Sequence, residues 1–225
     1  IERMEEILRK IGGREKTERI AQLLGQVDLN DPIAVNKFIQ SLYKPGIFDY
    51  ITEIFYNSIL SGPKTHIVNS MSNTANALFS PVERFVSALV DVPLAAIQQR
   101  ARERYLSEVP ADIFGAIRGI PEGFRQFAYV VKNGISFDQA TKWEFRQRAF
   151  RGKLGAAISM PSRFLEAADA LMKTINQRAA LNAEAHRLAA KEKLKGQAFE
   201  DRVAELLSSP TLEMLKEANR IAEYR

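Results

Sequence analysis

The chain has 225 residues, of which 46% are hydrophobic and 26% charged, and its formal net charge is +5. This length allows one large or two small domains with a buried core, and the positive surplus is well below that of a typical nucleic-acid-binding domain. The chain contains no cysteine, which excludes disulfides and Cys-ligated metals, and its two histidines, His66 and His186, are too far apart in sequence to suggest a His-rich metal site.

Helical periodicity dominates the sequence, and no window alternates with a period of two for long enough to predict a strand. The fold is therefore predicted to be all-α, a multi-helix bundle. The predicted helices cover residues 2–11, 15–25, 32–43, 47–60, 63–79 and 81–106, two short stretches within 109–133, and then 138–153, 163–195, 197–208 and 210–224. The longest, near 163–195, would extend for about 46–50 Å.

Proline and glycine indicate where these helices begin and end. Asp31-Pro32 supplies an N-cap followed by a proline in the first turn, and Gly62-Pro63 ends one helix and begins the next. Ser80-Pro81 is expected to interrupt the helix that follows, and Pro93 is expected to kink its continuation. Pro121 is expected to divide the next helical stretch into two short helices.

The predicted organisation is a region of short N-terminal helices at residues 1–45 and a main helical domain at residues 46–225. The chain begins at Ile1 within a charged amphipathic pattern and shows no secretory signal, so we expect it to be a segment of a much larger protein. Residues 74–99 are apolar, but charged residues and prolines interrupt them, and no membrane-spanning helix is predicted. Association with a membrane surface stays open, because the second half of this stretch carries little charge.

An uncharged polar stripe is predicted on the helix that follows Pro63. Asn69, Asn73 and Asn76 share one face with Ser72 and Ser80, although asparagine is a poor helix former. A solvated helix face usually carries Glu, Lys and Arg instead. The stripe therefore predicts amide hydrogen bonds across a contact with another helix or another subunit. A simple solvated face, or a contact with a ligand or nucleic acid, is the alternative.

A second candidate surface is the segment KWEFRQRAFRGK at residues 142–153. It combines basic residues with aromatic ones, and Lys142, Trp143, Arg146 and Phe150 are its candidate contact residues. Such a mixture suits weak binding to DNA or an acidic membrane surface. It equally suits a helix that packs through its aromatic rings while its arginines reach the solvent.

The long helix carries a polar group of its own. Asp169, Lys173 and Asn176 lie within a narrow arc, and Asp169 and Lys173 have the favourable spacing of a helical ion pair. No second carboxylate or histidine accompanies them, so they do not predict acid–base chemistry. The sequence contains no nucleophile–base arrangement and no nucleotide-binding fingerprint, and no catalytic, cofactor-binding or metal-ligating residue is predicted. We do not expect this segment to be an enzyme.

Several blocks of the sequence resemble a known class of protein. The blocks that carry the resemblance are LSGPKTHIVNSMSNTANAL, SPVERFV, GISFDQATKWE and PSRFLEAADALMKTINQRAALNAEAHRLA. They resemble a helical region of very large bacteriophage and prophage proteins, which are internal or ejected components of the virion. The LSGPKTHxVNxxSN block is the most specific. The block that contains Asp169, Lys173, Asn176 and Arg178 supports it, in the same order along the chain.

The resemblance implies a structural or interaction module that acts by helix–helix assembly. Its partners would be other copies of the chain or other virion proteins, and its location the interior of the phage particle, from which it would be ejected into the host cell. Enzymes of the parent protein would lie outside these residues. An alternative function is contact with nucleic acid or membrane through residues 142–153. The dependence of binding on salt concentration would distinguish these two functions, because affinity for nucleic acid falls steeply with salt whereas the packing of helices does not.

Overall fold

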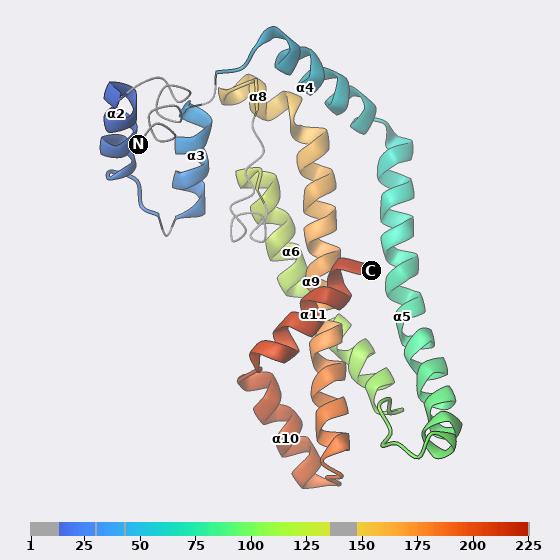
Figure 1. The fold of residues 1–225 in the computed structure, drawn as a ribbon. Coiled ribbons are helices and arrows are strands. Elements are labelled where there is room, and N and C mark those ends of the chain that lie inside the picture. Colours follow the sequence, from blue (N-terminus) through green and yellow to red (C-terminus); the bar gives the residue numbers. More distant parts are fainter. Residues whose placement is uncertain (1–13, 30, 43, 136–147, 225) are drawn as a thin grey trace. The chain divides into compact units, whose positions relative to one another are not determined.

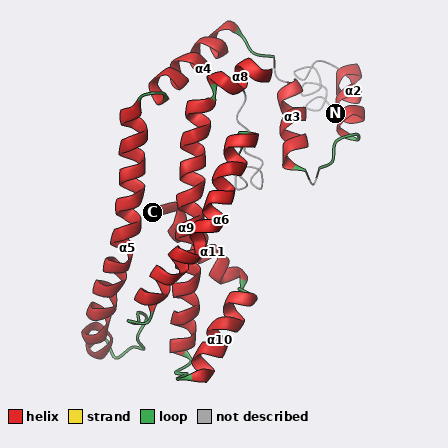
Figure 2. Ribbon diagram, turned by 180° about the vertical axis from the view of Figure 1, so that it is seen from behind, coloured by secondary structure: helices red, strands yellow, loops and turns green. Residues whose placement is uncertain are grey.

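The computed structural model describes residues 14–29, 31–42, 44–135 and 148–224. These residues form nine α-helices and no strand, and the predicted all-α multi-helix fold is confirmed (Figures 1 and 2). The helix expected at residues 2–11 lies outside the described residues, as does most of the one expected at 138–153.

The chain divides into two compact units. The first contains the described residues within 1–56 and 137–159, and the second those within 57–136 and 160–225. The division predicted from the sequence lies after residue 45. In the structure, a segment from the middle of the sequence joins the N-terminal helices. The helices that contribute to the first unit are α2 (Arg14–Leu24), α3 (Pro32–Leu42), most of α4 (Ile47–Leu60) and α8 (Gly152–Ile158).

Two local features position these helices. Asp31 Oδ1 accepts the backbone N–H of Ile33 at 2.9 Å, so the N-cap predicted before Pro32 is confirmed. Glu53 of α4 accepts the backbone N–H groups of Ala149 at 2.5 Å and Phe150 at 3.1 Å. These bonds hold α4 against the segment that leads into α8.

The second unit is built around two helices that lie side by side, α6 and α9 (Figures 1 and 2). Its helices are α5 (Pro63–Ile97), α6 (Glu108–Asn133), α9 (Met160–Lys191), α10 (Gln197–Ser208) and α11 (Leu212–Tyr224). Gly115, Gly119 and Gly123 form the stripe of α6 that faces α9, and all three are buried. Because glycine has no side chain, the two backbones approach closely there.

A core of small and aliphatic residues joins the C-terminal half of α9 to α10 and α11. Its buried members are Ala180, Leu181, Ala185, Ala189, Val203, Leu206, Met214 and Ala218. Alanines on α9 allow the two short helices to pack near its axis, and their larger side chains fill the space between. This end of the unit is therefore a conventional apolar core, in contrast to the packing of α5.

Several predicted boundaries were wrong. α5 runs through Ser80-Pro81, and α6 runs through Pro121. A proline removes one helical hydrogen bond, but packing before and after it can hold the helix together. Ser80 and Arg84 both bond to α6 on either side of Pro81, and glycines of α6 contact α9 on either side of Pro121.

The ends of other helices also differ from the predictions. α9, with 32 residues, is shifted about four residues toward the N-terminus relative to 163–195. α5, with 35 residues, is the longer helix, because its prolines do not interrupt it. α5 ends at Ile97 rather than near residue 106, and residues 148–151 are not helical before α8 begins at Gly152.

Candidate interaction surface

α5 buries polar side chains and two alanines, Ala88 and Ala95, on its inner side and exposes large apolar side chains on its outer side. Ser80 and Asp91 are 2% and 5% exposed, and Arg84 lies beside them on the buried face. The ten large apolar residues between Leu78 and Ile97, in contrast, are all exposed. At about 100° per residue, these apolar side chains fall on the side of the helix that faces away from the body of the unit. This is the reverse of an ordinary surface helix.

α6 repeats this inversion. Its buried face consists of three glycines, Ala111 and Val130, together with Glu108 and Asp112, which are each 2% exposed. Its outward face carries five large apolar residues with exposed fractions between 41% and 61%: Ile113, Phe114, Ile117, Ile120 and Phe124. We call these residues, together with the ten exposed ones on α5, the α5–α6 apolar surface.

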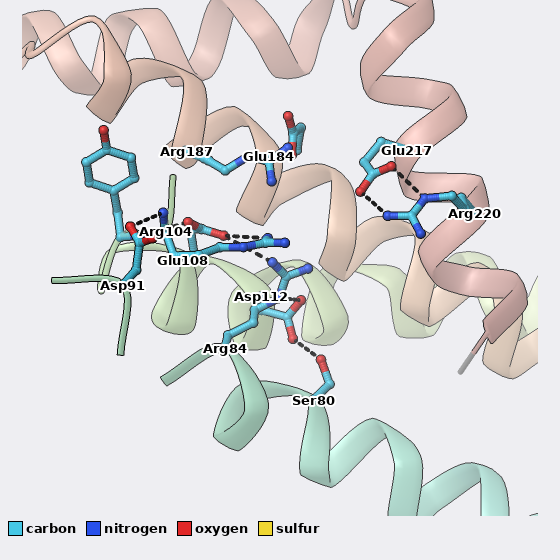
Figure 3. A network of polar contacts seen from close by, with 11 residues as sticks. Ser80, Arg84, Asp91, Arg104, Glu108, Asp112, Glu184, Arg187, Glu217 and Arg220 are labelled. Carbon is cyan, nitrogen blue, oxygen red and sulfur yellow. Dashed lines mark hydrogen bonds and ion pairs between the residues drawn. The ribbon is translucent and has the colours of Figure 1, made fainter. Parts of the chain in front are cut away.

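A polar network lies beneath this surface and joins the two helices (Figure 3). Ser80 donates a hydrogen bond to Asp112 Oδ2 at 2.8 Å, and Arg84 donates through Nε to Asp112 Oδ1 at 2.9 Å. The same guanidinium reaches Glu108 Oε2 through Nη1 at 3.2 Å. The side chains of Arg84, Glu108 and Asp112 are at most 9% exposed, so Arg84 compensates two buried carboxylates. The more exposed Arg104 also lies 3.9 Å from Glu108 Oε2 through its Nη1.

Burial dominates the titration of Glu108. Loss of hydration raises the pKa of this carboxyl group above its ordinary value, because the charged form is disfavoured away from water. The backbone N–H of Tyr105, which donates to Glu108 Oε1 at 2.8 Å, and the charge of Arg84 act in the opposite direction. Burial of Glu108 is therefore offset in part by the Tyr105 backbone hydrogen bond and by nearby arginines, Arg84 the first of them.

The loop between α5 and α6 is fastened by Asp91. Its Oδ1 accepts a hydrogen bond from Arg100 Nη2 at 2.7 Å, and its Oδ2 accepts the backbone N–H groups of Glu103 and Arg104 at 2.8 and 3.1 Å. The hydrogen bond from Arg100, followed by the one from the Arg104 backbone, lowers the pKa of Asp91 from 3.8 to about 2. Asp91 thus holds the loop between α5 and α6 closed by accepting these hydrogen bonds.

This lowered pKa predicts an acid-sensitive contribution to stability. A carboxyl group whose pKa is depressed in the folded state stabilises it fully above the unfolded pKa, and the contribution is lost as the pH falls from about 4 to about 2. We expect Asp91→Asn to lower the unfolding midpoint at neutral pH and to flatten the stability profile between these pH values. Urea unfolding followed by circular dichroism at several pH values measures both.

Asp201→Asn is the matched control. Within the described part of the chain, the side chain of Asp201 accepts one hydrogen bond, from the exposed side chain of Gln197. It should leave the acid part of the profile unchanged. A profile for Asp91→Asn that parallels that of the unaltered chain would contradict the assigned role of Asp91.

Two cavities lie against α9. The larger, of about 390 Å³, is mainly apolar and opens between α5 and α6. Its lining includes Leu78 and Pro81 of α5, Ile113 and Ile117 of α6, and the polar Asp112 and Asn176. The smaller, of about 150 Å³, is more polar and lies between α5, α9 and α11. Asn176, which is 3% exposed, lines both.

The smaller cavity brings together several residues that the sequence singled out. Asn73, Asp169, Lys173 and Asn176 all line it, together with Glu223 of α11, which lies 3.4 Å from Lys173 Nζ. Asp169 is exposed, whereas Asn73 and Lys173 are half-buried. The structure therefore joins the asparagine stripe of α5 to the polar arc of α9 at one point.

The other predicted contact residues are spread out. Asn69 and Asn76 are exposed in the single chain, so their burial against a partner stays a prediction. Arg178 pairs with Glu122 of α6, at 2.6 Å between Nη2 and Oε2. Phe150 is half-buried, and its ring meets that of Tyr50 edge-on with centroids 4.9 Å apart. Lys142, Trp143 and Arg146 lie outside the described residues.

Sequence reasoning missed the polar network. It treated Glu83, Arg84 and Asp91 only as interruptions of an apolar stretch. The available signal was their spacing, because Arg84 and Asp91 are seven residues apart and share a helix face while the remaining faces stay apolar. Ser80, which lies on the same predicted stripe, donates a hydrogen bond to Asp112 of α6, while the seam predicted for the asparagines stays a prediction.

Neither metal chemistry nor a membrane span is indicated by the described residues. They contain no group of three or more His, Asp or Glu side chains that could hold a metal ion. None of their helices combines the length and apolar character that crossing a bilayer requires. No known family model, curated protein or solved structure matches the chain.

Proposed function

We propose that this chain is an assembly module of a large phage virion protein, and that it acts by packing helices through the α5–α6 apolar surface. Its partners are other copies of the chain or other proteins of the particle, and its place is the virion interior. The phage context is supported by the LSGPKTHxVNxxSN block, residues 60–73, which runs from the last residue of α4 into the first turns of α5.

The observation that carries this proposal is the inverted polarity of α5. Exposed apolar patches on monomeric proteins rarely exceed a few hundred Å². Here Leu78, Phe79 and Ile97 are 71%, 63% and 77% exposed, while Arg84 and Asp91 are turned inward. Leaving apolar side chains in water while burying charged ones is unfavourable unless another apolar surface covers the outside.

Three substitutions on one face of α5 test this function. Val82, Val86 and Val90 are between 48% and 53% exposed, and glutamine has a higher helix propensity than valine. We expect the triple variant Val82→Gln/Val86→Gln/Val90→Gln to keep or raise the helix content of the single chain and to abolish its assembly. Sedimentation velocity over a range of concentrations measures assembly against the 25.3 kDa mass of one chain.

Leu212→Gln is the matched control, because Leu212 is 67% exposed but lies on α11, away from the α5–α6 apolar surface. It should leave assembly unchanged. If the unaltered chain and the triple variant sediment alike at every concentration, helix–helix assembly through this surface is refuted.

A further inference from the structure

We propose that a second copy of this chain covers the α5–α6 apolar surface, in a two-fold arrangement that lays α5 of each copy over α6 of the other. This inference rests on the proposed function and names its partner. The evidence lies in three properties of the surface: its extent, its shape and its charges.

The extent of the surface matches a protein–protein interface. Fully burying a large apolar side chain removes roughly 60–120 Å² from water at about 25 cal/mol per Å². With ten such residues on α5 and five on α6, each about half exposed, the exposed apolar area is on the order of 450–900 Å². Each partner contributes roughly 800 Å² to an interface of standard size. One further copy is therefore enough to cover it.

The shape of the surface is self-complementary. The apolar cavity of about 390 Å³ opens between Leu78 of α5 and Ile117 of α6. An apolar cavity of roughly 150 Å³ is already large enough to hold a benzene ring. The same surface presents exposed phenylalanines, among them Phe79 at 63% and Phe124 at 61%. One surface thus presents both a cavity of sufficient volume and exposed aromatic side chains, which is the combination that a self-complementary two-fold interface uses.

The charges of the surface select the arrangement. Among the exposed apolar residues α5 carries one exposed acidic residue, Glu83, whereas α6 carries two exposed basic residues, Arg118 and Arg125. If α5 packed on α5 of the partner, glutamates would face each other, and so would the arginines. Laying α5 over the partner's α6 instead places the acidic residue on the helix that carries the basic ones, which favours this pairing over the alternative.

The absence of cysteine from the chain makes this arrangement directly testable. Val82→Cys places a single thiol on α5 and Ile113→Cys a single thiol on α6, at positions 53% and 45% exposed. The Ser80–Asp112 hydrogen bond, 2.8 Å long, sets these two positions at a similar level along the two helices. The two variants are mixed and treated with a short bis-maleimide, and the products are separated by mass.

We expect the mixed cross-linked dimer in large excess over either same-variant dimer, and its loss when Val86→Gln and Val90→Gln are added. Leu212→Cys is the control and should give no cross-link with either variant. A predominance of same-variant dimers, or assembly in sedimentation without any cross-link, would overturn the two-fold arrangement and leave the proposed assembly function standing.

Two further outcomes overturn the inference in other ways. If the chain floats with vesicles of neutral phospholipid, and the triple glutamine variant does not, a lipid surface and not a second copy covers α5 and α6. If neither cross-linking nor sedimentation detects association, both this inference and assembly of the chain with itself fail.

Discussion

Replacing Gly115 with alanine should destabilise the second unit by about 2 kcal/mol or more. A glycine-to-alanine change inside a helix normally stabilises it by roughly 1 kcal/mol. Here the added Cβ would lie 2.6 Å from the backbone oxygen of Arg178 and 2.9 Å from Cα of Ala179. Backbone atoms cannot rotate away, so α6 and α9 would have to separate, and overpacking of this kind costs about 1–3 kcal/mol or more. Equilibrium unfolding in urea measures the change.

The expected loss of stability on replacement by alanine differs among the glycines. A Cβ at Gly119 would come no closer than 3.0 Å to the side chain of Arg178, and one at Gly123 no closer than 3.0 Å to the Leu171 oxygen. Alanine at either position should therefore cost less than at Gly115. At Gly25 the nearest atom is 3.5 Å away, and Gly25→Ala should change stability by less than about 0.5 kcal/mol. Equal effects at all four positions would contradict the close approach of α6 and α9.

Arg84→Met should cost about 3–5 kcal/mol of unfolding free energy at neutral pH. Removing one partner of a buried ion pair leaves a buried charge poorly compensated. Here Asp112 and Glu108 share the guanidinium of Arg84, and the nearby Arg104 is more exposed and 3.9 Å from Glu108. Methionine keeps most of the apolar stem of arginine, so little packing is lost. The control is Arg220→Met, which removes an ion pair whose arginine is 59% exposed and should cost no more than about 1 kcal/mol.

The pH dependence of Arg84→Met distinguishes a lost charge from lost packing. Burial already raises the pKa of Glu108, and without Arg84 that pKa rises further. A group whose pKa is raised in the folded state stabilises it below the unfolded pKa, and this contribution is lost as the pH rises through the folded pKa. The deficit of the variant should therefore shrink as the pH is lowered toward 4.5, the ordinary pKa of Glu. A deficit that stays constant with pH would mean that packing, not charge, is responsible.

The sequence predicted the helical class and many of the helix ends, because these depend on local chemistry. The helices at 47–60 and 197–208 have the predicted bounds, and Pro63 begins α5 as expected. The errors occurred where packing overrides local preference. By local preference alone, Ser80-Pro81 and Pro121 would each interrupt a helix. Contacts on both sides of each proline keep α5 and α6 continuous.

The candidate surface was predictable only in part. The sequence indicated that the outer part of α5 carries little charge, and it singled out Asn73, Asp169, Lys173 and Asn176, which the fold brings to one cavity. It gave no sign that Arg84 meets Asp112 and Glu108, because that contact joins residues 24 or more positions apart in the chain. Which side of an amphipathic helix faces inward follows from such contacts, and for α5 hydrophobicity alone gives the wrong side.

The fastening of the loop between α5 and α6 has a consequence for the order in which the chain folds. Carboxylates from both helices hold the backbone N–H groups of Glu103, Arg104 and Tyr105, and none of these contacts involves α9. Closing so short a loop costs little chain entropy, so the pair α5–α6 can form early and offer its glycine stripe as a template for α9. The Asp91→Asn variant should then refold more slowly, whereas an unchanged refolding rate with faster unfolding would place loop closure after the folding barrier.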